Sequence, residues 1–196
     1  MKNWDLLCHT VMNSLKENLA PFLTYHDWRH TEHVIRMSEY IAHKENITDE
    51  EILLIKTAAL FHDAGFIYSV SDGHEEASIE LAKDKLPQFG YTKIDIEIIA
   101  GMIRATSIPQ EPKTKLESIL ADADLEYLGT DSFERIGTNL YYEIKHTKPN
   151  LSITEWNEIQ IEFLQSHQYH TPYCIQYRNP IKQRNLKLLV EQRNER

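Results

Sequence analysis

Cysteine, glycine and proline are scarce in this 196-residue sequence, which contains two cysteines, six glycines and seven prolines. The cysteines, Cys8 and Cys174, lie far apart in the chain. The sequence therefore predicts neither a disulfide-stapled scaffold nor a zinc finger built on paired thiolates. So little glycine and proline disfavours a turn-rich β-sandwich and favours helices joined by short loops. No stretch approaches the roughly 18 consecutive apolar residues that span a bilayer.

Basic residues are also in the minority, with 21 lysines and arginines against 30 aspartates and glutamates and a formal net charge of −9. A negative chain is repelled by nucleic acid polymers and by anionic membranes, so neither is an expected partner. A small phosphorylated substrate is compatible with this charge because a bound cation reverses the local field. Without a signal-peptide pattern or paired cysteines, the sequence predicts a cytoplasmic protein.

Apolar residues recur at helical spacing along most of the chain, which predicts an all-α fold. The first helix is expected from Trp4 to Leu19, and Pro21 ends it. Pro180 is expected to kink or split the last helix. The other helices are expected at about 30–44, 52–64, 77–86, 94–105 and 116–128, with an N-cap near Ser71-Asp72 and later helices opened by Asp131-Ser132, Thr154 and Thr171-Pro172.

The adjacent pair His62-Asp63 stands at the end of an apolar run and is followed by alanine and glycine. Successive residues of a continuous helix point about 100° apart, so both side chains converge only if the helix ends here. Imidazole and carboxylate suit a divalent cation, which the negative C-terminal end of a helix also favours. His30 upstream and Asp124 downstream are candidates to complete a four-ligand site, with Asp122 competing for the place of Asp124.

Four short motifs follow one another in the chain. They are Tyr25-His26-x-x-x-His30-x-x-x-Val34, Leu60-Phe61-His62-Asp63-Ala64-Gly65, His74-Glu75-Glu76-Ala77-Ser78 and Ala121-Asp122-Ala123-Asp124-Leu125. In this order, over about residues 25–129, they resemble the HD superfamily of metal-dependent phosphohydrolases. The resemblance implies an all-helical HD-domain bundle and hydrolysis of a phosphate ester, commonly of a nucleotide. It also implies the metal ligands His30, His62, Asp63 and Asp124.

We expect a single HD-type domain over residues 1–196, with a metal-bearing core at about 25–129 and an additional C-terminal helical layer at about 131–196. The ligand types do not distinguish Mn, Fe, Mg, Ni, Co and Zn. Where binuclear members of the family supply further histidines, this chain reads Met102 to Pro109 without an imidazole. One divalent metal ion is therefore predicted and a second is not expected, with His74 the candidate for water contact or a labile second ion.

Further roles are assigned from side-chain chemistry. Asp63 is predicted both to bind the metal and to accept a hydrogen bond from the attacking water. Glu75 or Glu76 is the candidate base, and His26 is the candidate acid that protonates the leaving oxygen. Candidate phosphate contacts are the basic side chains Arg104, Lys56, Arg178 and Lys182.

The sequence thus predicts a phosphohydrolase that cleaves a small, nucleotide-like phosphate ester by metal-activated water. Two other classes stay open at this point. One is a non-catalytic nucleotide-binding regulatory module that retains the metal site, and the other is an oxygenase with an iron centre on the same helices. The identity of the substrate does not follow from the sequence, because side chains from distant helices form the wall of the pocket that selects it. The oligomeric state does not follow from the sequence either.

Overall fold

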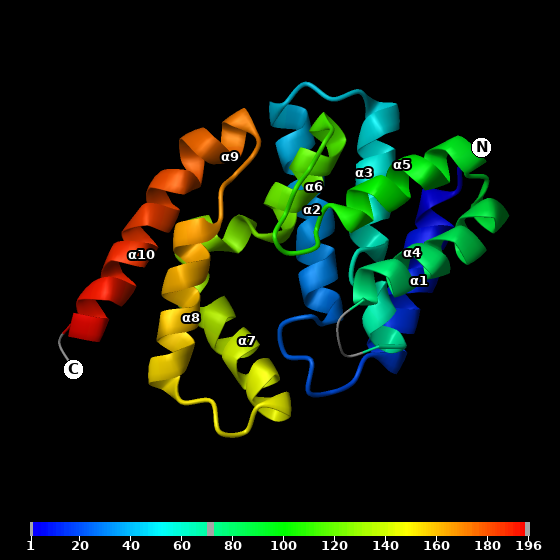
Figure 1. The fold of residues 1–196 in the computed structure, drawn as a ribbon. Helices are drawn as coiled ribbons and strands as arrows, with labels where there is room; N and C mark the ends of the chain where they lie inside the picture. Colours follow the sequence, from blue (N-terminus) through cyan, green and yellow to red (C-terminus); the bar gives the residue numbers. More distant parts are fainter. Residues whose placement is uncertain (1, 70–72, 195–196) are drawn as a thin grey trace.

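The structure is a computed structural model that describes residues 2–69 and 73–194 (Figure 1). Within these ranges every regular element is helical, which confirms the predicted all-α fold. None of the helices in this part of the chain is both long and apolar enough to cross a membrane. The α-helices are α1 (Trp4–Asn18), α2 (Trp28–Lys44), α3 (Asp49–Phe61), α4 (His74–Lys85), α5 (Lys93–Arg104), α6 (Lys115–Asp124), α7 (Phe133–Thr147), α8 (Ile153–Ser166), α9 (Pro172–Tyr177) and α10 (Asn179–Asn194).

Three short 3-10 helices follow α-helix ends: η1 (Ala64–Ile67), η2 (Leu86–Phe89) and η3 (Glu126–Gly129). The third explains why α6 stops at Asp124 rather than near residue 128. The chain leaves the α-helical conformation at Leu125, whose φ and ψ are −102° and 16°, and continues in the tighter 3-10 turn. As a result Asp124 is the last residue of its helix.

Capping side chains set the starts of several helices. Asp27 accepts hydrogen bonds from the backbone N–H groups of Arg29 and His30, so α2 begins earlier than expected and includes His30 in its first turn. The prediction that Thr154 opens α8 is wrong, because Ser152 and Glu155 form a capping box two residues earlier. The N-cap expected near Ser71-Asp72 lies outside the described residues.

Pro180 occupies the second position of α10 and separates it from α9, which confirms the predicted split. Proline is tolerated there because the first turn of a helix has no intrahelical partner for its backbone N–H groups. The two helices differ in direction at the upper left of Figure 1.

Helices α1 to α6 pack around one hydrophobic core. Its centre is α3, whose residues from Thr57 to Phe61 are all fully buried and which lies against α1, α2, α5 and α6. This segment of α3 is almost entirely apolar because a helix surrounded on all sides by other helices needs no polar face. The end of α3 is thereby fixed in the interior of the protein.

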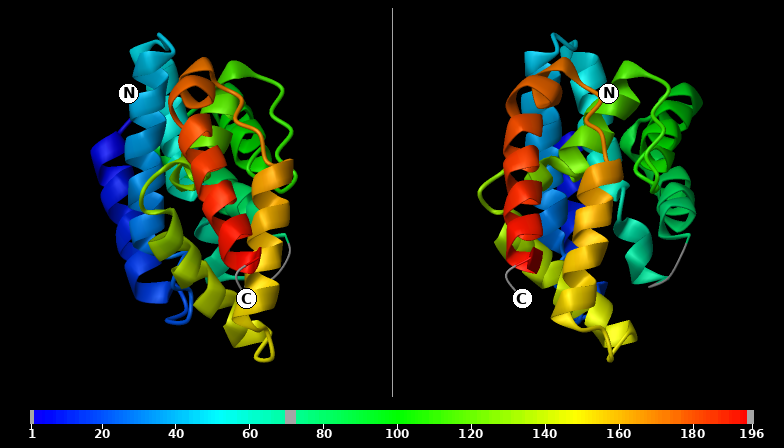
Figure 2. Two further views of the ribbon diagram at one scale, coloured as in Figure 1. Left: turned by 90° about the vertical axis from the view of Figure 1, so that its left-hand side faces the viewer. Right: turned by 60° about the vertical axis from the view of Figure 1, so that its left-hand side comes forward.

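Helices α7 to α10 form a second layer beside this core (Figures 1 and 2). The layer has its own apolar cluster, in which Phe133 and Leu164 pack with Tyr25, Leu125 and Leu128 of the metal-bearing segment. Because the cluster combines residues from both sides, the layer rests on η3 and not only on its own helices. A space between the two layers then has one wall from each.

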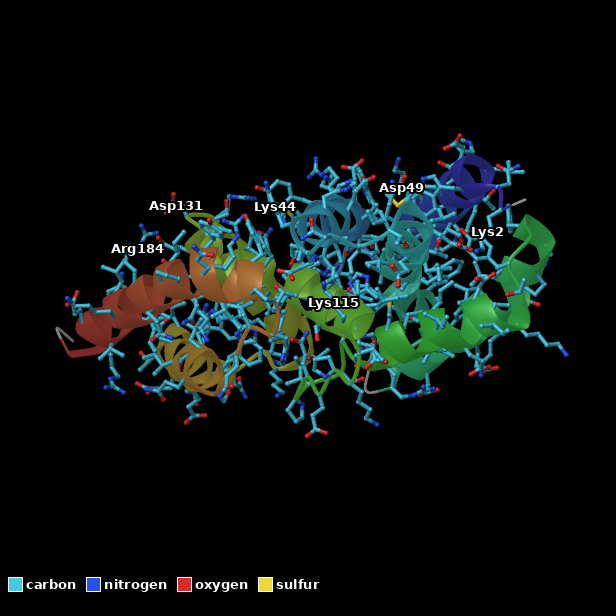
Figure 3. The ribbon with its side chains drawn as sticks, turned by 90° about the horizontal axis from the view of Figure 1, so that it is seen from above. Lys2, Lys44, Asp49, Lys115, Asp131 and Arg184 are labelled. Atoms are coloured by element: carbon cyan, nitrogen blue, oxygen red, sulfur yellow. The ribbon has the colours of Figure 1, made fainter. Side chains whose placement is uncertain are left out.

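Polar contacts tie the layer to the core. The buried carboxylate of Asp122 accepts hydrogen bonds from the backbone N–H groups of His170 and Thr171 and from the Thr171 hydroxyl, at 2.9, 2.8 and 2.6 Å. Asn185 of α10 donates to the carbonyl oxygen atoms of Leu128 and Thr130. Charged pairs such as Asp131 with Arg184 lie on the outside, as Figure 3 shows from above. The buried contacts therefore carry the attachment, since exposed pairs contribute little.

Candidate metal centre

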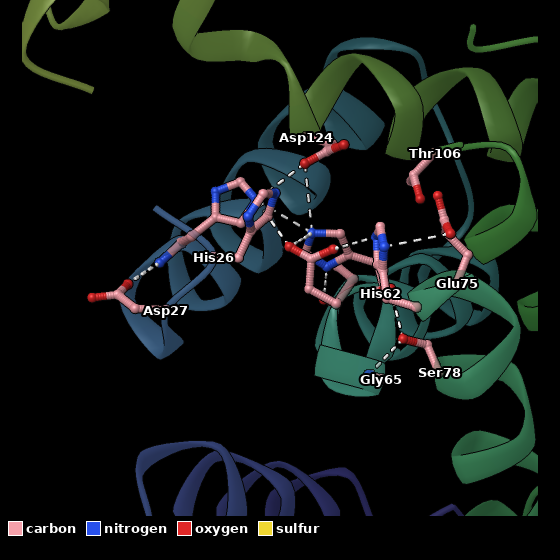
Figure 4. A network of polar contacts seen from close by, with 12 residues as sticks. His26, Asp27, His62, Gly65, Glu75, Ser78, Thr106 and Asp124 are labelled. Atoms are coloured by element: carbon pink, nitrogen blue, oxygen red, sulfur yellow. Dashed lines mark hydrogen bonds and ion pairs between the residues drawn. The ribbon is translucent and has the colours of Figure 1, made fainter. Parts of the chain in front are cut away.

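Three helix ends meet at a cluster of imidazoles and carboxylates (Figure 4). His30 lies in the first turn of α2, His62 and Asp63 follow the last residue of α3, and Asp124 ends α6. The His62 side chain is fully buried, and those of the other three are between 8% and 13% exposed. The C-terminal ends of α3 and α6 add partial negative charge, so the position favours a cation.

The four side chains expected from the sequence come together. The Nε2 atoms of His30 and His62 are 3.3 Å apart. Asp124 Oδ1 lies 3.1 Å from His30 Nε2 and 3.5 Å from His62 Nε2, and Asp63 Oδ2 lies 3.5 and 3.1 Å from the same two atoms. Ligand atoms of His30, His62 and Asp124 all lie within 4.8 Å of one another. This spacing is compatible with donors arranged around a single ion.

Two details show that the donor set fits a divalent cation. His62 Nδ1 lies 2.8 Å from the carbonyl oxygen of Ala59, so Nδ1 carries the proton and the Nε2 lone pair faces the carboxylates. In addition, Asp63 Oδ2 is buried and makes no well-aligned hydrogen bond within the described residues, and its polar neighbours are the two Nε2 atoms. A buried carboxylate oxygen without a well-aligned hydrogen bond is costly unless a cation balances it.

Protonation at the cluster follows from the same contacts. Burial by itself would lower the pKa of His62, but the carboxylates of Asp63 and Asp124 outweigh it and raise this pKa well above its usual value. Burial would raise the pKa of Asp124, but hydrogen bonds and charge from His30 and His62 hold it at about 2. Protons and a cation compete for these atoms, so metal binding at this cluster depends on pH.

His74 and Glu75, at the start of α4, lie beside the cluster. His74 Nε2 is 3.5 Å from Asp63 Oδ1, and His74 Nδ1 is 3.5 Å from Glu75 Oε2. Ser78 fixes α4 in this position, because its hydroxyl donates to the carbonyl oxygen of His62 and accepts from the N–H of Gly65, at 2.8 and 2.7 Å. His74 is therefore within reach of water or an ion held by Asp63.

His26 also lines the site and is held by a residue that the sequence analysis missed. The carboxylate of Glu143 in α7 accepts from the backbone N–H groups of Tyr25 and His26, at 2.8 and 3.0 Å, and from His26 Nδ1. Burial would lower the pKa of His26, but the hydrogen bond to Glu143 and the negative charges of Asp63, Glu143 and Asp124 raise it. Glu143 could have been suspected, because its spacing from Leu140 and Ile144 places a carboxylate on the buried face of its helix.

The other predicted residues are spread over the protein. Glu76 pairs outward with Arg104, and both side chains are more than half exposed. Lys56 pairs with Glu39, and Arg178 pairs with Glu126. Lys182 is buried and donates to the carbonyl oxygen of His167. The structure does not bring any of the four predicted phosphate contacts to the metal cluster, because each already has a partner elsewhere.

Two residues whose roles the sequence left open are placed by the structure. Asp122 accepts hydrogen bonds from the start of α9, so of the two candidate aspartates only Asp124 lies among the clustered donors. His33, which shares the helix of His30, lies 3.3 Å from a carboxylate oxygen of Glu126. It therefore contacts a neighbouring acid and is not one of the clustered donors.

A cavity of about 240 Å³ opens onto this cluster. Asp63, Asp124, His26, His74 and Glu75 line its end in the metal-bearing core. A molecule in this cavity would therefore meet the clustered donors, the imidazole of His26 and the carboxylate of Glu75 in the same space.

Comparisons with known proteins agree with this geometry. A search among curated proteins finds no match. The chain is similar to the crystal structure of a predicted HD superfamily hydrolase from an uncultured Thermotogales bacterium, with a TM-score of 0.56 and 21% sequence identity over 80% of this chain and 88% of that one. The family model described as HD domain matches residues 27–126, just over half of the sequence, which includes all four clustered residues. The chain therefore belongs to the HD domain family.

Proposed function

We propose that the protein is a metal-dependent phosphohydrolase that cleaves a phosphate ester of a small molecule, with one divalent cation held by His30, His62, Asp63 and Asp124. One observation carries this proposal. Two imidazole Nε2 atoms, 3.3 Å apart, and the buried Oδ2 atom of Asp63, which lies 3.1 and 3.5 Å from them, face one another at the end of an open cavity. Mixed imidazole and carboxylate donors are those of a hydrolytic metal site.

When bound, the cation lowers the pKa of its water and neutralises phosphoryl oxygen atoms. The carboxylate of Asp63 orients the attacking water, since one of its oxygen atoms faces the imidazoles while the other faces His74. Glu75 lines the cavity and accepts the proton of that water. Glu76 is the weaker candidate base, because Arg104 holds its carboxylate outside the cavity.

His26 supplies the proton to the leaving oxygen. Glu143 accepts the Nδ1 proton, which leaves Nε2–H as the imidazole donor available to a substrate. The raised pKa of His26 favours retention of this proton. His26, held by Glu143, thus works as an acid with a fixed orientation. The products of cleavage are inorganic or ester-bound phosphate and a neutral alcohol.

The nucleotide-like substrate expected from the sequence stays a prediction. The test is to load the purified protein separately with Mn, Mg, Fe, Co, Ni and Zn, count the bound ions, and measure hydrolysis of a panel of nucleotides and other phosphate esters. His62→Gln serves as the inactive variant and His33→Gln as its matched histidine control. One ion per chain and turnover that only His62→Gln abolishes are expected.

Absence of turnover with every metal and ester would refute the hydrolase. If nucleotides then bind tightly, and the binding is unchanged in Glu75→Gln and His26→Asn, the protein is a regulatory module that retains the metal site.

A further inference from the structure

The cavity beside the metal cluster has two chemically different walls. The core wall carries the acids and histidines described above, together with the phenols of Tyr25 and Tyr127, which hydrogen-bond to each other. The opposite wall is built by α7 and α8, which lie beside the core in Figure 1, and η3, between the two layers, contributes Tyr127 and Leu128 to the cavity. Because residues of both walls line the same cavity, a molecule in it contacts both.

The C-terminal wall is almost entirely apolar. Its lining side chains include Phe133, Leu140, Trp156, Phe163 and Leu164. Among the described residues no lysine or arginine lines the cavity, and the charged side chains in it are those next to the metal cluster. Such a wall stabilises an apolar group by removing it from water and gives no partner to a polyhydroxylated one.

Among the described residues of this wall, Gln160 of α8 is the single polar one that lines the cavity. Its amide is half-buried, packs over Gly137, where an added Cβ would lie 2.6 Å from Nε2, and has no hydrogen-bond partner within the described residues. One amide satisfies one polar substituent. A nucleoside, with its sugar hydroxyls and the polar edge of its base, would leave several groups without partners.

We propose that the cavity binds the alcohol part of the substrate and that this alcohol is apolar, with a single ring or a short branched chain and at most one polar substituent, met by Gln160. This rests on the proposed phosphohydrolase, because the phosphate is then held at the metal end. The size agrees: 240 Å³ exceeds the roughly 150 Å³ of a cavity that holds benzene and leaves no room for a large second ring system.

Trp156 provides a direct test by binding, without turnover. It lies in the apolar wall and is 4% exposed, whereas Trp4 and Trp28 do not line the cavity. In the Trp4→Phe/Trp28→Phe double variant loaded with Zn²⁺, emission is titrated with phenylphosphonate, methylphosphonate and adenosine monophosphate. We expect phenylphosphonate to change the emission and to bind at least about tenfold more tightly than methylphosphonate.

Titration calorimetry on the unaltered chain gives the same affinities if the double variant does not fold. Leu140→Asn places an amide in the apolar wall and should reduce the preference for phenyl over methyl, while Ile175→Asn, at a residue that is 51% exposed on α9, should not. Equal affinity for the two phosphonates, or tighter binding of the nucleotide, overturns the proposal.

The two proposals fail in different ways. A strong preference for phenylphosphonate without hydrolysis of any ester would support the apolar cavity and refute the proposed hydrolase reaction. Hydrolysis of nucleotides in preference to aryl and alkyl phosphates would support the hydrolase reaction and refute the proposal that the alcohol part of the substrate is apolar.

Discussion

The metal-bearing core and the C-terminal layer contribute opposite chemistry to one cavity. The core presents His26, Asp63, Glu75 and Asp124, and each of these side chains stands at or near a helix end. The layer presents leucine, phenylalanine and tryptophan side chains that are spread along α7 and α8. Helix ends have free backbone groups and a local field suited to ions, whereas helix faces offer continuous apolar surface. Reaction and selectivity can therefore vary separately.

Glu143 is the exception to this division. It lies in α7 of the layer, yet its carboxylate holds the backbone and the ring of His26 in the core. The layer thus has one contact through which it acts on the proposed chemistry. Substitutions on either side of the cavity test how far the two regions are independent.

The largest effect is expected for His62→Gln. Removal of this fully buried ligand should abolish metal binding and lower hydrolysis on the order of a thousandfold or more, as is typical when a central catalytic group is lost. Elemental analysis and initial rates measure the two effects. Affinity for a purely apolar cavity ligand such as toluene should stay within about twofold, because the layer wall is unchanged. A parallel loss of that affinity would show that the two regions are not independent.

Glu143→Gln should have the next largest effect, a loss of about a hundredfold in rate, because the acid loses the group that orients and charges it. Activity that needs protonated His26 falls as pH rises through its raised pKa, so the variant should lose activity at lower pH than the unaltered protein. The pH profile of kcat measures this shift. An unchanged alkaline limb would contradict the assignment of His26 as the acid.

The same pair has a defined effect on stability. His26 contributes stability that is complete below its unfolded value of 6.5 and disappears as pH rises through its raised pKa. Glu143, whose lowered pKa results from the contact with His26 against the opposing effect of burial, contributes stability that is complete above 4.5 and disappears as pH falls. Urea unfolding should therefore show the greatest deficit of Glu143→Gln between about pH 4.5 and 6.5.

Gly65→Ala should cost about 1 to 3 kcal/mol of unfolding free energy. An added Cβ would lie 2.0 Å from the carbonyl oxygen of His74 and 2.7 Å from the backbone nitrogen of Ser78, neither of which can move without α4. Gly101→Ala in α5 is the matched control, since its Cβ would meet only the flexible end of Glu117 at 3.2 Å. Urea unfolding of both variants measures the difference, and equal stabilities would contradict the close packing.

The smallest effect is expected for Gln160→Leu in the layer wall. An apolar side chain of similar size in place of the unpaired amide should raise the affinity for phenylphosphonate by about three- to tenfold and leave metal content unchanged. Gln165→Leu on an exposed part of the same helix is the control. Calorimetric titration decides the result, and weaker binding by Gln160→Leu would mean that the amide contacts the ring region of the ligand.

The core was more predictable from the sequence than the layer. His62 and Asp63 were recognisable because an apolar segment ends directly before them, and the structure shows the helix end that lets both side chains converge. The motif order also placed His30 and Asp124 correctly within the cluster. For His30 and Asp124 the order of the family motifs was needed, because the helical pattern alone extended the helix of Asp124 to about residue 128.

The contacts that depend on tertiary packing were not predictable in the same way. From the sequence alone, Arg178 and Lys182 were available as phosphate contacts. In the folded protein Arg178 pairs with Glu126 and Lys182 donates to the carbonyl oxygen of His167, and these contacts form only when the layer packs on the core. Glu143 is distant in the sequence from His26, and no local pattern joins them. The start of α8 and the end of α6 differ by a few residues from the bounds predicted from the sequence. Capping residues and 3-10 turns shift a helix end by that much without changing its apolar pattern.

The Ser78 hydroxyl, fully buried, bridges the carbonyl oxygen of His62 and the amide of Gly65, and so fastens α4 to the turn that bears two of the donors. If binding of an ion reduces the mobility of that turn, these two hydrogen bonds would extend the effect to α4. Amide hydrogen exchange along α4 should slow when the ion is captured, which would make this helix an internal reporter of occupancy that needs neither a label nor a substrate.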